Sequence, residues 1–128
     1  MTQILQKTIK LNNGLYMPAL GLGTGFLKDQ KAFYNAIIDY GYRHIDTSTY
    51  TGNEKEVGAA VKQAIATGKV KRSDLFIATK IWHNSYHDPE TALRKALDIM
   101  ELEEVDIYYV HWPNNFFSER KIPMYLLW

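Results

Sequence analysis

Residues 42–50 read YRHIDTSTY, and this stretch organises the whole prediction. Its first five residues form a short candidate strand with Ile45 at the apolar centre and Asp46 at the end. Polar residues typical of a turn follow. Asn53 and Glu56 then have the spacing of a capping box, with Asn in place of Ser or Thr, and predict the start of a helix. A carboxylate at the carboxyl end of a strand, followed by a polar turn and a helix, is typical of active sites in α/β proteins.

The flanking sequence predicts alternating strands and helices. Residues 8–17 indicate a β-hairpin, because Asn13-Gly14 is a strong hairpin-turn signal. Apolar runs and helical spacing predict strands at 18–24, 42–46, 75–81 and 105–110, and helices at 29–40, 53–68 and 88–100. The first strand is expected to be buried, and the last to be covered on both faces. Strands separated by helices imply a parallel sheet with right-handed crossovers.

Two parallel-sheet architectures are compatible with this order. A doubly wound dinucleotide fold would use the glycines of residues 21–25 with Asp46, but its third glycine position is Phe26, which is too large for close helix–strand packing. A (β/α) barrel instead takes catalytic residues from the ends of several strands. Each of the four predicted strands has a polar residue at or next to its carboxyl end, namely Thr24, Asp46, Lys80 and His111. This pattern favours the barrel.

Residues 41–47, GYRHIDT, followed by Asn53-Glu54 and Val57-Gly58, resemble the aldo-keto reductase family. The resemblance implies an α/β fold of the (β/α)8 TIM-barrel type. Such barrels need about 250 residues, so we expect residues 1–128 to be a single domain holding only the first half, about four β/α units plus the N-terminal hairpin. The apolar segment 120–128 resembles the family's approach to its fourth helix and looks cut rather than finished.

The resemblance also implies NADPH-dependent reduction of aldehydes or ketones to alcohols. Hydride delivered to a carbonyl carbon leaves charge on the oxygen, and an acid must supply a proton. By resemblance the catalytic residues are Asp46, Tyr50, Lys80 and His111. The phenol is the acid, the lysine cation favours the tyrosinate, the aspartate keeps that lysine charged, and a neutral histidine orients the carbonyl.

The tyrosine departs from the family pattern. In the family it lies five residues after the aspartate, whereas Tyr50 lies four residues after Asp46 and position 51 is Thr51. The distance from Asp46 to Glu54 matches that of the family, so one turn residue has been lost before the tyrosine and one gained after it. A threonine hydroxyl is far too weak an acid. We therefore expect Tyr50 to be the proton donor.

Binding residues follow from the same resemblance. The cofactor NADPH is expected to contact Gly23, Thr24 and Asp46, although the family holds its phosphates largely with the second half of the barrel. The substrate, a small carbonyl compound, is expected to contact Phe26, His111 and Trp112. Alternatives are a non-catalytic, barrel-derived binding or regulatory subunit, or an inactive fragment. If the chain is half of a reductase, a missing barrel half or a second copy of the chain is expected to complete it.

Composition excludes other classes. The net charge of +1 gives no electrostatic reason to expect a nucleic-acid or membrane partner. Cysteine is absent, which excludes disulfides and cysteine metal sites. His83 and His87 lie in a predicted loop, so no metal site is expected there, and His44 is expected to pack or to form a local hydrogen bond. No segment looks like a secretory signal or a membrane span, so a cytoplasmic location is expected.

Overall fold

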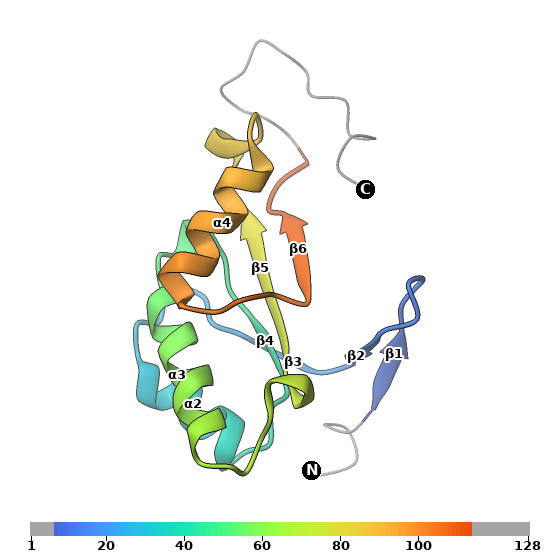
Figure 1. Ribbon diagram of the computed structural model, residues 1–128, viewed down its shortest axis with the longest axis vertical. Coiled ribbons are helices and arrows are strands. Elements are labelled where there is room, and N and C mark those ends of the chain that lie inside the picture. Colours follow the sequence, from blue (N-terminus) through green and yellow to red (C-terminus); the bar gives the residue numbers. More distant parts are fainter. Residues whose placement is uncertain (1–6, 114–128) are drawn as a thin grey trace.

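The computed structural model describes residues 7–113 (Figure 1). A two-stranded antiparallel hairpin, β1 (Thr8–Lys10) with β2 (Tyr16–Pro18), precedes a four-stranded parallel sheet. The strands of that sheet are β3 (Gly21–Gly23), β4 (His44–Asp46), β5 (Phe76–Ile81) and β6 (Ile107–Val110). The α-helices are α2 (Gln30–Ile38), α3 (Glu54–Ala66) and α4 (Pro89–Met100). Short 3-10 helices are η1 (Thr49–Thr51), η2 (Arg72–Asp74) and η3 (His83–Ser85).

The sheet has the order β3-β4-β5-β6, and every neighbouring pair is parallel. Its strands alternate with the three α-helices along the chain, and Figure 1 shows these helices gathered on one side of the sheet. The predicted hairpin, strand order and parallel pairing are therefore confirmed. In this arrangement the carboxyl ends of all four strands lie at the same edge.

The core lies between the sheet and helices α2 and α3. The helical spacing places Phe33 and Ile37 of α2 and Val57 and Val61 of α3 on the buried faces of their helices. From the sheet, Ile45 and Ile77 complete the same cluster, and both are fully buried. These two isoleucines are partners in the β4–β5 register. Packing in the core thus fixes the positions of β4 and β5, the two strands that end at the candidate site.

The first and last strands of the sheet differ from their predictions. Residues 18–24 were expected to form one buried strand, but Pro18 belongs to β2, and β3 is only three residues long with both glycines exposed. Strand β6 was expected to be covered on both faces, yet all its residues are only half-buried. In the described part of the chain each of these strands is an edge strand with a single neighbour, and the glycines of β3 have no side chain to pack.

Of the two predicted helix caps, the one at α4 is confirmed and the one at α3 is wrong. Asp88 caps α4, since its Oδ1 accepts a hydrogen bond from the N–H of Thr91 at 3.1 Å, and Pro89 begins the helix as expected. The capping box at the start of α3 is wrong, because the side chain of Asn53 makes no capping hydrogen bond. That amide is engaged by segments outside the helix, as described below.

Gly58 sets how closely α3 approaches the end of α4. A Cβ atom at this position would lie 2.0 Å from the carbonyl oxygen of Met100, a backbone atom that has little freedom to move. We expect Gly58→Ala to lower the free energy of unfolding by about 1–3 kcal/mol, the usual cost of overpacking, as measured by chemical denaturation. Gly23→Ala is the control, because a Cβ there meets nothing within 4 Å. Equal stability of the two variants would contradict the close approach.

Candidate active site

Asp46 and Lys80 form an ion pair at the carboxyl edge of the sheet. The Nζ atom of Lys80 lies 2.6 Å from Oδ1 of Asp46 and also donates a hydrogen bond to the carbonyl oxygen of Thr47 at 2.8 Å. Asp46 pairs in register with Ala78, two residues before Lys80, so the two charged side chains share one face of the sheet. Their side chains are 34% and 22% exposed respectively. Both remain reachable from solvent while being held in a single geometry.

His111 follows β6 directly and joins this edge. Its backbone N–H donates to the carbonyl oxygen of Ile81 at 3.2 Å, which extends the β5–β6 pairing by one bond. Burial lowers the pKa of the imidazole, and the charge of Lys80 lowers it further, whereas Asp46 opposes this shift. The buried Nδ1 atom finds no hydrogen-bond partner within residues 7–113. The ring is therefore predominantly neutral at neutral pH.

Tyr50, rather than Thr51, lies against His111. The ring of Tyr50 stacks on Trp82 with a centroid distance of 4.0 Å and meets the ring of His111 edge-on at 5.7 Å. The hydroxyl of Thr51 instead lies inside the turn, 2.8 Å from both the carbonyl oxygen of Ser48 and Oδ1 of Asn53, and shares its proton between them. The one-residue shift read from the sequence is thus compatible with a tyrosine at this edge.

Aromatic side chains surround this group. Phe26, on the loop after β3, meets Tyr50 edge-on at 5.6 Å, and Trp112 stacks on His111 at 6.3 Å. Both Phe26 and Trp112 are largely exposed. Trp82 was missed in the sequence analysis, although its position two residues after Lys80 at the end of a strand was a usable signal. Together these rings form an apolar surface beside the ion pair.

Gly23 and Thr24 differ in what they offer to a cofactor. Gly23 is exposed, and a Cβ atom added there would meet nothing within 4 Å, so its backbone is open to approach. Thr24 is 4% exposed, and both its hydroxyl and its backbone N–H donate to the carbonyl oxygen of Asp46, at 3.0 and 2.9 Å. Thr24 therefore ties β3 to β4, and neither its hydroxyl proton nor its backbone N–H is left to donate to a ligand.

Two further polar residues, the buried Glu54 and the half-buried His44, serve the framework. Glu54 accepts a hydrogen bond from the hydroxyl of Thr79 at 2.6 Å, which joins α3 to β5, and burial raises the pKa of its carboxyl group. His44 packs edge-on against Phe76 at 5.0 Å and lies 3.3 Å from the carbonyl oxygen of Pro18, in agreement with the expected packing role. No group of three or more metal-ligating side chains occurs among residues 7–113.

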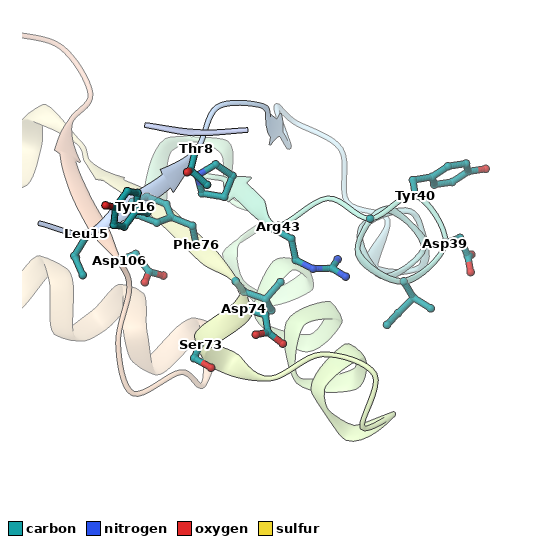
Figure 2. A pocket seen from close by; sticks show the side chains of 14 residues that line it. Thr8, Leu15, Tyr16, Asp39, Tyr40, Arg43, Ser73, Asp74, Phe76 and Asp106 are labelled. Atoms are coloured by element: carbon teal, nitrogen blue, oxygen red, sulfur yellow. The ribbon is translucent and has the colours of Figure 1, made fainter. Parts of the chain in front are cut away.

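A cavity of about 770 Å³ lies at the other end of the strands. Figure 2 shows its lining, in which Arg43, Phe76 and Asp106 stand at the amino ends of β4, β5 and β6. The rest of the wall is formed by the hairpin, through residues such as Tyr16, by the segment 38–41 at the end of α2 and by the segment 73–75 at η2. None of the predicted site residues lines this cavity. It is therefore separate from the edge that carries the ion pair.

Comparison with known proteins identifies the family. The model of the Aldo/keto reductase family matches residues 19–125. The chain belongs to the aldo/keto reductase family. It is 43% identical over 113 residues to the aldose reductase of Encephalitozoon cuniculi, covering 86% of this chain and 38% of the relative. It is 46% identical over 115 residues to the NAD(P)H-dependent D-xylose reductase I,II of Candida tropicalis, covering 85% of this chain and 35% of the relative.

Solved structures of the family agree with the fold. The Bombyx mori aldo-keto reductase in complex with NADP matches with a TM-score of 0.78 and 36% identity over 84% of this chain and 38% of that one. The aldose reductase of Schistosoma japonicum matches with a TM-score of 0.77 and 32% identity, over 84% and 37%. The chain thus spans little more than a third of these relatives. The predicted barrel class, represented here by its first half, is confirmed, and the doubly wound alternative is wrong.

Two sequence predictions stay untested by these observations. The predicted approach to a fourth helix at 120–128 lies outside the described residues. Within the described part of the chain no helix is both long and apolar enough to cross a membrane; the cytoplasmic location remains a prediction.

The opposing effects of Lys80 and Asp46 on His111 can be measured. We expect the imidazole to titrate below its ordinary pKa of about 6.5. Lys80→Met should raise this pKa, because it removes a repelling cation, and Asp46→Asn should lower it, because it removes an attracting anion. Nitrogen-detected NMR titration of His111 measures both shifts. Shifts of the same sign in the two variants would contradict the assigned electrostatics.

Proposed function

We propose that this chain carries the acid–base half of an active site that reduces aldehydes or ketones to alcohols with NADPH. The observation that carries the proposal is the Asp46–Lys80 ion pair with His111 and Tyr50 at the same edge of the sheet. The relatives support it, since they include an aldose reductase, an NAD(P)H-dependent xylose reductase and a reductase solved with NADP.

Each of the four side chains has a separate role in the acid–base chemistry. The charge that develops on the carbonyl oxygen during reduction needs a hydrogen-bond donor and then a proton. Tyr50 donates the phenolic proton to that oxygen, and the Lys80 cation stabilises the phenolate that remains. Asp46 holds Lys80 in place through the 2.6 Å contact. His111, whose lowered pKa keeps it neutral, donates a hydrogen bond that orients the carbonyl group.

NADPH, when bound, supplies the hydride. The open backbone at Gly23 and the partly exposed carboxylate of Asp46 fit a ligand that approaches the carboxyl edge of the sheet. Thr24 contributes through its hydroxyl oxygen as an acceptor, because its hydroxyl proton and its backbone N–H are both donated to the carbonyl oxygen of Asp46. The family resemblance assigns the remaining cofactor contacts to the second half of the barrel. These three residues would therefore hold only the part of the cofactor next to the reacting carbonyl.

The substrate is proposed to be a small carbonyl compound that contacts the aromatic surface. Phe26 and Trp112 are exposed beside Tyr50 and His111, respectively. Their rings exclude water from the reacting carbonyl, which strengthens the electrostatic contacts made by Lys80 and His111.

Lys80→Met and Tyr50→Phe are expected to lower the rate of carbonyl reduction by about 100-fold or more, the usual cost of losing a positioned acid–base group. The rate is followed as NADPH consumption with an aromatic aldehyde. Lys62→Met is the matched control, because Lys62 pairs with Glu101 on the exposed surface of the helices. Reduction by Lys80→Met at the rate of Lys62→Met would contradict the assignment. NADPH fluorescence changes without any turnover would instead indicate a non-catalytic binding protein.

A further inference from the structure

Asn53 joins the two loops that border the candidate site. Its side chain is fully buried. The Oδ1 atom accepts a hydrogen bond from the hydroxyl of Thr47 at 2.7 Å, and it shares the proton of the Thr51 hydroxyl, 2.8 Å away, with the carbonyl oxygen of Ser48; both threonines lie in the turn after β4. The Nδ2 atom donates to the carbonyl oxygens of Gly25 at 2.9 Å and Leu27 at 2.8 Å, both in the loop after β3. One amide thus connects two loops whose bonded residues lie at least 20 positions apart in sequence.

Each of these loops carries an aromatic residue of the site. Tyr50 lies between Thr47 and Thr51 on the turn, and Phe26 lies between Gly25 and Leu27 on the other loop. The two rings meet edge-on at 5.6 Å. Tyr50 is 51% exposed and Phe26 is 68% exposed, so burial of the rings themselves does little to fix them. Their separation depends on the backbone segments that Asn53 holds.

The side-chain amide of Asn53 is suited to linking the two loops, and it does not cap helix α3. Asn53 stands at the N-terminus of α3 but makes no capping hydrogen bond, unlike Asp88 at α4. The Oδ1 atom of the amide faces hydroxyl groups that donate hydrogen bonds. The Nδ2 atom faces carbonyl oxygens that accept them. Only a side-chain amide offers an acceptor and two donors in this way. Aspartate would keep the first set of bonds and lose the second.

We propose that Asn53 is a positioning residue that sets the separation of Tyr50 and Phe26, and hence the width of the carbonyl-binding site. This inference rests on the proposed function for its kinetic consequences. Asn53 acts through its neighbours without touching substrate. Its oxygen side controls Tyr50, the proton donor, and its nitrogen side controls Phe26, a substrate contact. Loss of the bonds on the nitrogen side should therefore change mainly KM, and loss of those on the oxygen side should change mainly kcat.

Two variants separate these signatures. Asn53→Asp, assayed above neutral pH as the carboxylate, keeps the acceptor for Thr51 but places a second oxygen against the carbonyls of Gly25 and Leu27. It should raise KM for the carbonyl about tenfold with kcat little changed. Thr51→Val frees the turn that carries Tyr50 and should lower kcat about 10- to 100-fold, the scale of a small misplacement of a reacting group, with KM less affected. Thr67→Val is the control, since its hydroxyl donates to the carbonyl oxygen of Ala64 at the end of α3.

A second readout does not require turnover. The chain has three tryptophans, and Trp112→Phe with Trp128→Phe leaves Trp82 alone beneath the ring of Tyr50. In this background Thr51→Val should increase quenching of Trp82 fluorescence by acrylamide, whereas Asn53→Asp and Thr67→Val should not. If the parent protein reduces no carbonyl, the proposed function fails while this measurement still decides the positioning role.

Two results would overturn the inference. One is equal quenching of Trp82 in Thr51→Val and Thr67→Val. The other is a change of kcat and KM together in both site variants, in proportion to their loss of thermal stability. Either result would mean that Asn53 supports the fold as a whole and does not set the position of individual site residues.

Discussion

The parallel pairing of β4 with β5 is the constraint on which the site depends. This register joins Ile45 to Ile77 in the core, and one step further along it places Asp46 beside Ala78. Because β5 continues past that point, Lys80 extends beyond the end of β4 and its side chain reaches back to Asp46. Pairing in another register would separate the two charges and remove the centre of the site.

The ion pair itself contributes little to holding these strands together. Both side chains are partly exposed, and pairs of this kind stabilise a fold by about 1 kcal/mol or less. The buried cluster formed by α2, α3 and the two central strands is far larger, with side chains such as Phe33, Ile37 and Val61 excluded from water. Hydrophobic burial therefore fixes the geometry, and the charges occupy positions that the core has already determined.

The turn after β4 shows how a shifted tyrosine fits the framework. Gly52 ends η1 in the left-handed conformation, with φ of 63°, which costs glycine little and other residues more. This reversal brings Asn53 back beneath the turn. There its Oδ1 atom accepts hydrogen bonds from the hydroxyls of Thr47 and Thr51. The side chain of Thr51 is thereby directed into the structure, while the ring of Tyr50 lies on the aromatic surface.

The sequence by itself determined the order of elements, the parallel sheet and the four polar residues at its edge, of which Thr24 proved to tie two strands together. Those features follow from local periodicity and from the rule that parallel strands end together, so all four residues could be named in advance. Tertiary structure decided the roles of Asn53, Thr24 and Trp82. Asn53 looked like a helix cap because its spacing to Glu56 is local, but its partners lie on a loop more than twenty residues away. Which hydrogen bonds a buried amide forms depends on how distant loops close around it, and no local pattern encodes that closure.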